Sequence, residues 1–175
     1  MFNLILSIII LIFLAGFILF FFIDMMVSFY FGAPFVDTGN NLVDAIVRLG
    51  NPKSHDIFYD LGCGSGKIVC AFARKQVLRS TGIEITPSAY HLSKFRNRNL
   101  KNAKIIYKNF DNVDFSDGTI IYCYLFPSLV QKLAKRFERQ LKANTKVICQ
   151  DFPIESKKPE QIIKVGRHKL FLYKY

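Results

Sequence analysis

The segment that most constrains this chain is a glycine-rich run at residues 59–67, with the sequence YDLGCGSGK. The residues just before it, 56–59, are typical of a short buried strand, and apolar residues recur at helical spacing after it, from Ile68 to Phe72. The glycines therefore occupy a strand-to-helix turn, which brings bare backbone N–H groups and a helix N-terminus close to a ligand. Glycine suits this turn because a Cβ would block close approach and oppose positive φ. The run predicts a ligand-binding loop.

Three nucleotide-binding loops share features with this run. The dinucleotide fingerprint, G-x-G-x-x-G, requires a third glycine where this chain has Lys67. A phosphate-binding loop, G-x-x-x-x-G-K-[ST], requires glycine in place of Leu61 and Ser or Thr in place of Ile68. Both of these patterns fail on spacing. What remains is an acid, Asp60, followed by G-x-G-x-G, which is similar to the loop of Rossmann-like S-adenosylmethionine-dependent methyltransferases.

Two acidic residues fit such a ligand. S-adenosylmethionine ends in an amino acid, so Asp60 can serve its cationic group. A second acid is expected after the next strand to hold the ribose hydroxyls. Glu84 lies 18 residues after Gly66, close to the offset of roughly 20 residues found in related folds. Taken singly, Asp60 is an ordinary strand-end turn residue and Glu84 a solvated loop acid; their order around the glycines favours the cofactor site.

The N-terminal segment predicts a membrane anchor. Residues 4–23 are twenty residues without a charge, and a helix of that length rises about 30 Å, the hydrocarbon thickness of a bilayer. A cleaved signal peptide would carry a basic n-region, a shorter apolar core and an A-x-A-like site, which this segment lacks. A mitochondrial presequence would be rich in arginine, yet the first basic residue is Arg48. A buried core helix is rarely apolar all round over this length. We expect residues 1–31 to form a transmembrane anchor with an interfacial end, and residues 32–175 to form the second domain.

Charge predicts the topology of the chain. All 24 Lys and Arg follow the anchor, so the positive-inside rule places the C-terminal domain in the cytoplasm as part of a single-pass membrane protein. The residues expected at the interface are Asp24, Phe29, Tyr30, Phe31 and Phe35.

Two basic stretches follow, 94–108 without an acid and 132–146 around Glu138 alone. They would suit an anionic leaflet, where each surface cation gains roughly 1 kcal/mol; solvated helix faces explain many of them as well. RNA is a further alternative, but no RNA-stacking motif supports it, so no nucleic-acid partner is expected.

The cysteines and histidines indicate no metal site. Cys63, Cys70, Cys123 and Cys149 form no C-x-x-C pair, and three of them fall on expected core elements, so they are typical of small buried hydrophobes in a reducing compartment. The three histidines are scattered, without metal-ligand spacing.

Strands and helices alternate along the rest of the chain. Thr38 is a candidate N-cap for a helix that ends near Gly50. A later helix has Thr86 as its N-cap and Pro87 in its first turn. The pattern predicts a doubly wound α/β sheet closed by an antiparallel hairpin. The expected strands are 57–60, 80–84, 104–108, 119–125, 145–152, 160–165 and 168–175, and the expected helices after the first are 67–76, 86–99 and 127–141.

Taken together, these pieces resemble a narrower group: the membrane-anchored lysine methyltransferases that act on the ATP synthase c-subunit and the adenine nucleotide translocase, with their small prokaryotic relatives. The loop alone resembles methyltransferases in general. The order of the pieces, the short stretch between the third and fourth strands, and the apolar segment ahead of them narrow the resemblance. The matching stretches are 34–38, 59–68, 82–84, 109–110, 113–116 and 124–127.

The resemblance implies roles for individual residues. The methionine end of S-adenosylmethionine would be lined by the loop residues Asp60, Gly62, Gly64 and Gly66, with Cys63 between them. Glu84 would take the ribose. Asn109, where the family usually has Asp, would contact the adenine amino group, since an amide still accepts through its carbonyl. Asp37 replaces a proline that is typical of the group, and Thr38 either closes over the cofactor or serves as a plain N-cap.

The acceptor side carries fewer signals. Tyr124, Phe126 and Pro127 would line the acceptor channel, and Asp151 would face the amine; core packing is the alternative, and for Phe126 the favoured one. The resemblance implies methyl transfer to a lysine side chain of a membrane protein. Two other functions stay open: a methyltransferase acting on a small molecule or lipid, such as a quinone or phospholipid headgroup, and a catalytically silent membrane adaptor.

Overall fold

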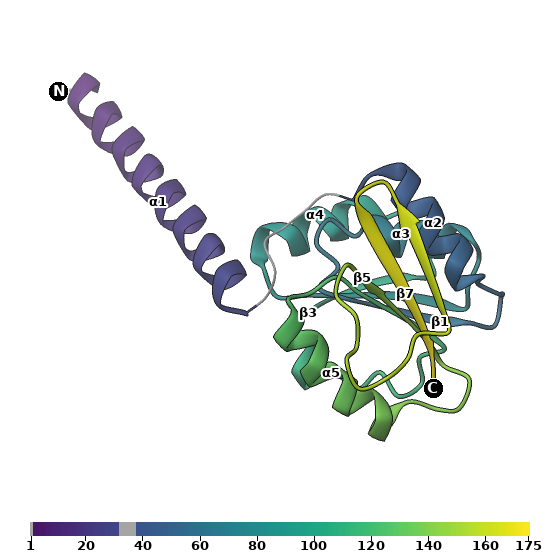
Figure 1. Ribbon diagram of the computed structural model, residues 1–175. Coiled ribbons are helices and arrows are strands. Elements are labelled where there is room, and N and C mark those ends of the chain that lie inside the picture. Colours follow the sequence, from purple (N-terminus) through teal and green to yellow (C-terminus); the bar gives the residue numbers. More distant parts are fainter. Residues whose placement is uncertain (1, 32–37) are drawn as a thin grey trace.

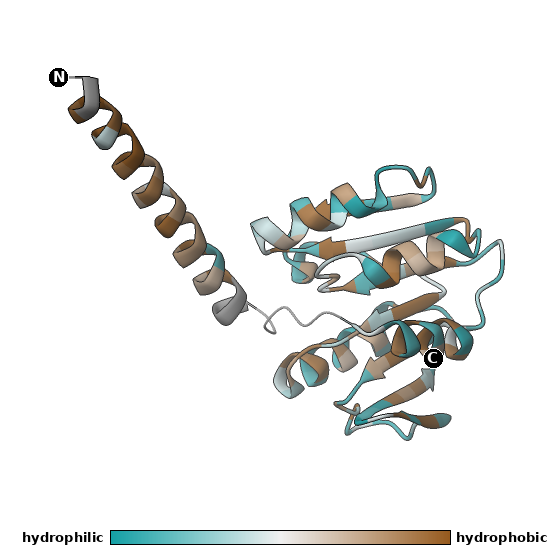
Figure 2. Ribbon diagram, turned by 90° about the horizontal axis from the view of Figure 1, so that it is seen from above, coloured by the Kyte–Doolittle hydropathy of each residue, from teal (hydrophilic) through white to brown (hydrophobic). Residues whose placement is uncertain are grey.

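The structure, a computed structural model, describes residues 2–31 and 38–175. Its first element, α1 (Phe2–Phe31), is a long helix that stands apart from an α/β domain (Figure 1). Within α1, Leu4–Val27 has a mean hydropathy of 3.2, and none of its most apolar stretch is covered by the described chain. Figure 2 shows α1 hydrophobic on nearly all sides, whereas the elements of the domain alternate in polarity. By length and composition, α1 is able to cross a membrane.

The domain contains a seven-stranded sheet with the order β3-β2-β1-β4-β5-β7-β6. All neighbouring strands pair in parallel except β7, which runs antiparallel to both β5 and β6. The expected α/β Rossmann-like sheet with its C-terminal antiparallel hairpin is therefore confirmed. The strands are β1 (Ile57–Leu61), β2 (Arg79–Glu84), β3 (Ala103–Tyr107), β4 (Ile120–Cys123), β5 (Lys146–Gln150), β6 (Gln161–Val165) and β7 (His168–Lys174); the helices are α2 (Asn40–Gly50), α3 (Lys67–Arg74), α4 (Pro87–Asn97), the short 3-10 helix η1 (Phe110–Asn112) and α5 (Pro127–Gln140).

Side chains alternate between the two faces of the sheet, and each face has its own core. On one face Phe58 stacks on Phe72 of α3, with ring centroids 3.8 Å apart, and α2 packs beside them. On the other face Phe115 meets Phe137 of α5. All four cysteines are buried and free, as their apolar surroundings predicted. The helices thus cover both faces and leave the strand ends open for a ligand.

Strand order places the glycine-rich loop where ligands bind. The chain runs outward from β1 to β3 and then crosses to β4 beside β1, so the order reverses between β1 and β4. In open α/β sheets, ligands bind at the carboxyl ends of the strands at such a reversal. The loop that follows β1 lies at this point.

Two predicted helix caps differ from the structure. Thr38 is not the N-cap of α2: the helix begins one residue later, after Gly39, whose carbonyl accepts from the amides of Leu42 and Val43. The Thr38 carbonyl instead accepts from Nζ of Lys67, at 2.6 Å, which ties this segment to the start of α3. Thr86 is the N-cap of α4, but its side chain caps nothing within the described residues. The predictions at Pro34, Phe35, Val36 and Asp37 lie outside the described residues.

Candidate active site

Three loop glycines adopt the left-handed backbone conformation. Their φ values are +82° at Gly62, +51° at Gly64 and +70° at Gly66, in the region that side chains other than glycine rarely occupy. At Gly66 space is limiting as well, because a Cβ would lie 2.6 Å from Nδ2 of Asn97. The sequence pattern G-x-G-x-G is thus required by this backbone.

Strand β2 and helix α4 hold the loop in place. The amides of Gly62 and Cys63 both donate to the carbonyl of Ile83, at 2.9 and 3.0 Å. From α4, Arg96 donates to the carbonyl of Ser65 at 2.8 Å and Asn97 to that of Gly66 at 3.1 Å. These contacts preorganise the loop through backbone atoms.

Cys63 has a packing role within the loop. Its Sγ lies so near Gly82 of β2 that a Cβ there would be 2.6 Å away. Burial, reinforced by the charges of Asp60 and Glu84, raises the pKa of the thiol well above its usual range. Cys63 therefore stays a neutral thiol, and it lies in the loop expected to bind the cofactor.

Asp60 is a buried carboxyl group without a local partner. It is 1% exposed, and its Oδ1 has no hydrogen-bond partner among the described residues. Burial, and secondarily the charge of Glu84, raises the pKa of Asp60 well above its usual range. An unpaired buried carboxylate is costly, so this side chain fits a ligand that brings its own cation, such as the ammonium group of S-adenosylmethionine.

Glu84, by contrast, is fully engaged by the backbone. Its Oε2 accepts from the amide of Gly64, and its Oε1 accepts from the amides of Ile85 and Thr86, each at 2.8 Å. A carboxylate offers about four acceptor positions, so one remains for a hydroxyl group. Glu84 thus joins the loop to the end of β2 and keeps capacity for the ribose contact expected of it.

Asn109 follows β3 at the same edge of the sheet. Its Oδ1 accepts from the amide of Asp111 at 2.9 Å and so caps η1. A carbonyl oxygen has two lone pairs, and the second stays open to a donor such as an adenine amino group. The adenine contact itself remains a prediction.

On the acceptor side, the structure brings Asp151 and Tyr124 together. Partial burial alone would raise the pKa of Asp151, but hydrogen bonds from His168 (Nδ1 to Oδ2, 2.8 Å) and the amide of Lys169 (2.9 Å) lower it overall. Partial burial, then the charge of Asp151 and a hydrogen bond to it, raise the pKa of Tyr124. Asp151 also has a positive φ of 62°, a conformation that is uncommon outside glycine and often found at functional sites. The result is an ionised carboxylate held at the carboxyl edge of β5.

Three residues of this cluster were missed by sequence reasoning: His168, Tyr122 and Gln150. The Tyr122 hydroxyl donates to Oε1 of Gln150 at 2.6 Å, and Gln150 Nε2 lies 3.5 Å from Oδ2 of Asp151. Tyr122 is also the register partner of Asp60 on the neighbouring strand, so the cluster connects with the cofactor side. A lone histidine 17 residues beyond Asp151 carries no sequence signal, because only the pairing of β7 with β5 brings the two together.

Two further predicted residues flank the cluster. Phe126 is 42% exposed, so the expectation that it packs in the core is wrong. It is the N-cap residue of α5, and the helix turns its ring away from the core formed by Val130 and Leu133. Pro127 occupies the first position of α5, where its fixed φ suits a helix start.

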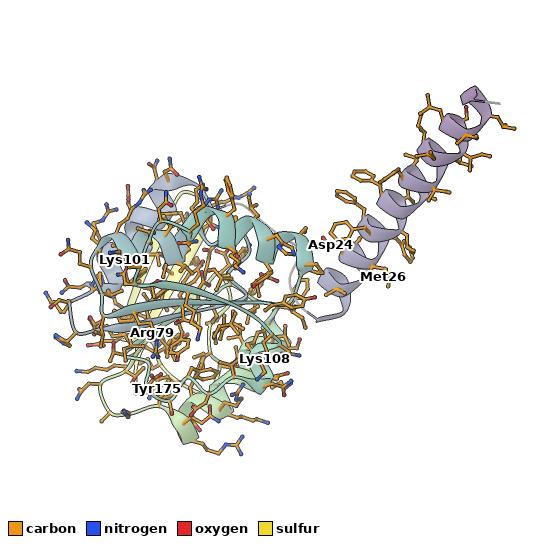
Figure 3. All side chains as sticks on the ribbon, turned by 180° about the vertical axis from the view of Figure 1, so that it is seen from behind. Asp24, Met26, Arg79, Lys101, Lys108 and Tyr175 are labelled. Atoms are coloured by element: carbon orange, nitrogen blue, oxygen red, sulfur yellow. The ribbon has the colours of Figure 1, made fainter. Side chains whose placement is uncertain are left out.

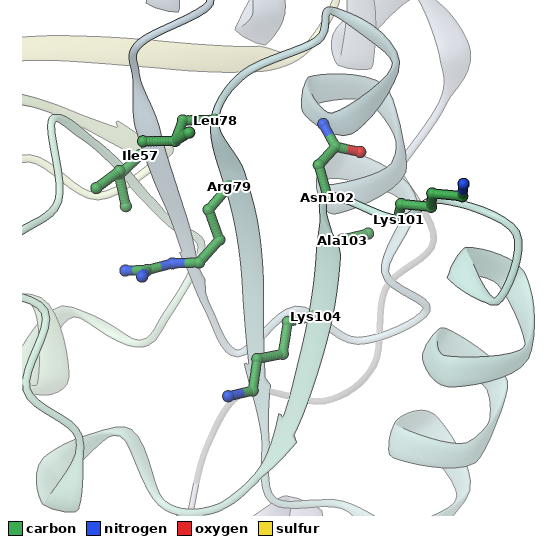
Figure 4. A pocket seen from close by; sticks show the side chains of 7 residues that line it. All are labelled: Ile57, Leu78, Arg79, Lys101, Asn102, Ala103 and Lys104. Atoms are coloured by element: carbon green, nitrogen blue, oxygen red, sulfur yellow. The ribbon is translucent and has the colours of Figure 1, made fainter.

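A second hollow lies at the opposite edge of the sheet. It has a volume of about 340 Å³ and contains the first residues of β2 and β3, Arg79 and Ala103 (Figure 4). Because ligands of such sheets bind at the carboxyl ends of the strands, this hollow is not the cofactor site. Within the described residues, no group of three or more His, Cys, Asp or Glu is placed to hold a metal ion.

Known proteins similar to this chain agree with this geometry. Residues 60–161 match the ANTKMT methyltransferase domain. A protein-lysine N-methyltransferase from Saccharolobus islandicus is 30% identical over 148 residues, which is 80% of this chain and 92% of that protein. The human lysine N-methyltransferase of the ATP synthase c-subunit is 25% identical over 80% of this chain, and the mouse adenine nucleotide translocase lysine N-methyltransferase also 25%. The chain spans about 60% of the length of these animal relatives.

Solved structures give the same assignment. An RNA methyltransferase from Salinibacter ruber, in complex with S-adenosyl-L-homocysteine, superposes with a TM-score of 0.76 at 27% identity, covering 79% of this chain and 93% of that one. A methyltransferase from Thiobacillus denitrificans with the same ligand shares the fold, with a TM-score of 0.59 at 17% identity over 74% of this chain and 55% of its own. With the loop, the free Asp60 carboxyl and the match to the family domain, the chain belongs to the ANTKMT methyltransferase domain family and is an enzyme that uses S-adenosylmethionine as its cofactor.

Proposed function

We propose that this enzyme methylates a lysine side chain of a protein at the membrane surface. The observation that carries the proposal is the ionised Asp151 carboxylate beside Tyr124, at the carboxyl edge of β5. Only β4 separates this strand from β1 and the cofactor loop. A carboxylate in this position suits a cationic amine as it approaches the cofactor. The names of the relatives, which include protein-lysine N-methyltransferases, support the same acceptor.

On the cofactor side, each residue has a separate task. Asp60 binds the ammonium group, Glu84 the ribose and Asn109 the adenine amino group, while Gly62, Gly64 and Gly66 let the backbone approach. When bound, S-adenosylmethionine supplies a methyl group that is already activated on a sulfonium. The protein therefore mainly aligns donor and acceptor and excludes water.

On the acceptor side, the lysine must become neutral before it reacts. Asp151 attracts the cationic side chain, and partial burial beside Tyr124 and Phe126, near a sulfonium, lowers the pKa of the amine. The amine first releases a proton to water. Its nitrogen then forms the new bond to the methyl carbon as the carbon–sulfur bond breaks, which leaves S-adenosylhomocysteine and a methylated ammonium group. No side chain is assigned as a general base.

The apolar helix α1 supports a membrane location. With its basic residues all after the anchor, the domain would lie in the cytoplasm. The starts of α4 and α5, which follow the carboxyl ends of β2 and β4, are the parts of the domain nearest α1 (Figure 1). Asp24 near the end of α1 accepts from the amide and hydroxyl of Ser88 in α4, at 2.9 and 2.7 Å. The active-site edge would therefore face the bilayer, where a lysine close to the membrane surface can enter.

The acceptor can be identified with labelled methyl groups. Full-length enzyme is added to membranes that lack it, with S-adenosylmethionine carrying a labelled methyl, and label is counted separately in protein and organic-solvent fractions. Base-stable label in one protein band supports lysine methylation and identifies the target. Label in the solvent fraction would overturn the lysine acceptor and favour a quinone or phospholipid headgroup. Asp60→Asn, which keeps the fold but lacks the cofactor contact, is the matched control and should transfer no label to either fraction.

A further inference from the structure

Helix α4 is joined to the end of the apolar helix by a single carboxylate. Figure 3 shows Asp24 where α1 meets the domain. Asp24 accepts from the amide of Ser88, the second residue of α4, and this is the bond that an N-cap side chain ordinarily provides. The N-cap residue itself, Thr86, makes no such bond within the described chain. Asp24 thus caps α4 from another helix and holds the start of α4 at the end of α1.

The face of α4 that contacts α1 continues as an exposed apolar stripe. Residues separated by four and seven positions share one face of a helix, so Ser88, Leu92 and Phe95 form a single line. Leu92 is 43% exposed and Phe95 is 62% exposed. The domain packs against a different stripe of the helix, Ala89, Ser93 and Asn97, all of which are buried. Leu92 and Phe95 therefore contribute little to the core of the domain, and their exposure calls for a partner.

The charge around this stripe is entirely positive. Lys94 and Arg98 flank it, and the Arg98 guanidinium lies 3.8 Å from the centre of the Phe95 ring. From residue 85 to residue 110 the sequence has no acid. The edge strand β3, which packs beside α4, adds Lys104 and an exposed Tyr107. An apolar stripe bordered by cations is the composition of helices that lie in the headgroup region of anionic membranes.

We propose that α4 lies on the surface of an anionic leaflet beside the anchor, with Leu92 and Phe95 at the boundary between headgroups and acyl chains. Lys94 and Arg98 then contact lipid phosphates. The inference rests on the proposed membrane location, because the Asp24–Ser88 contact places the stripe at the bilayer only if α1 spans it. Arg96 and Asn97 of the same helix hold the cofactor loop. Lipid contact therefore sets the height and tilt of the active site above the membrane.

The contact can be measured in the full-length protein with a fluorescent label on an introduced cysteine. The four native cysteines are buried, so a surface cysteine reacts first. The test variants are Phe95→Cys and Leu92→Cys. The matched control is Ile162→Cys, because Ile162 is similarly exposed, at 55%, but lies on β6 at the opposite edge of the sheet. Each variant is labelled with an environment-sensitive dye and placed in phosphatidylcholine vesicles containing phosphatidylglycerol and a lipid carrying a nitroxide at headgroup depth.

The proposal predicts a blue shift and several-fold stronger quenching at positions 95 and 92 than at 162. Replacing the anionic lipid by phosphatidylcholine alone, or introducing Lys94→Glu with Arg98→Glu, should reduce that quenching. Equal quenching at all three positions would overturn the proposal. So would a stripe that stays aqueous in lipid and is shielded only when membranes with a methylatable protein are added, since the partner would then be that protein.

A fourth label separates this proposal from the anchor on which it depends. At Gly16, in the middle of the apolar stretch, a Cβ would meet nothing within 4 Å, so Gly16→Cys is tolerated. A label buried in lipid at position 16 together with an aqueous label at position 95 would refute the placement of α4 alone. An aqueous label at position 16 would refute the membrane anchor, and with it both proposals. Neither readout depends on which acceptor is methylated.

Discussion

Replacing each site carboxylate by its amide should separate the roles of Asp60 and Glu84. Asp60 makes no local bond through Oδ1, and its pKa is raised by burial. A carboxyl whose folded pKa lies above its unfolded pKa contributes stability only while it is protonated, and that contribution is lost as pH rises through the folded pKa. At neutral pH the cofactor-free protein therefore bears the cost of a buried charge. Asp60→Asn removes this charge, so the cofactor-free domain should unfold at the same temperature as the wild type or at a higher one.

Glu84→Gln should have the opposite effect on stability. The glutamate accepts three backbone N–H groups through its two oxygens, and an amide NH₂ must face at least one of them. A hydrogen bond to a charged group contributes about 1.5–3 kcal/mol, so the domain should lose at least about 1.5 kcal/mol. For a domain of this size, that corresponds to a fall of about 5 °C or more in Tm.

Both variants should bind the cofactor more weakly. Removing one partner of a hydrogen-bonded buried charge pair costs about 2–5 kcal/mol, so Asp60→Asn should raise the Kd for S-adenosylmethionine by about 30-fold or more. Titration calorimetry and thermal unfolding by circular dichroism measure the two effects on full-length protein in detergent micelles. Asp117→Asn is the matched control: Asp117 pairs with Arg79, away from the loop, and its loss should leave the affinity unchanged. Binding by Asp60→Asn within about twofold of wild type, or unfolding as low as that of Glu84→Gln, would refute this account.

Three more predictions concern the site. Because the raised pKa of Asp60 must be overcome before an ammonium can pair with it, cofactor affinity should fall as pH is lowered; calorimetry in buffers of different ionisation enthalpy should detect proton release on binding. Gly66→Ala requires φ of +70° and places a Cβ 2.6 Å from Asn97, so urea unfolding should show a loss of about 1–3 kcal/mol, with weaker cofactor binding; full stability would contradict the geometry. Asp151→Asn should lower the rate of labelled methyl transfer about tenfold or more, as expected from losing a charge-assisted contact worth about 1.5–3 kcal/mol, with the cofactor Kd unchanged; a matching loss of cofactor affinity would place Asp151 in the wrong subsite.

The elements of the fold were predictable because their signals are local. Hydrophobic periodicity located the strands and helices to within about two residues of their bounds, and Pro87 and Pro127 marked two helix starts. The cap at Thr38 was wrong because its carbonyl was engaged by Lys67, 29 residues away. The exposure of Phe126 was also mispredicted, since an aromatic residue in an apolar run is usually buried, and only the packing of α5 shows that this one is not.

The sequence by itself determined the strand, the glycine turn and the helix that follow one another from residue 57 to residue 74. It also determined the position of Asp60 relative to the glycines and the apolar character of residues 4–27. These features depend on neighbours along the chain. Only the tertiary structure decided that His168 orients Asp151 and that Asp24, 64 residues before Ser88, caps α4. Such contacts depend on strand order, register and helix placement, and one slip in any of these separates the partners.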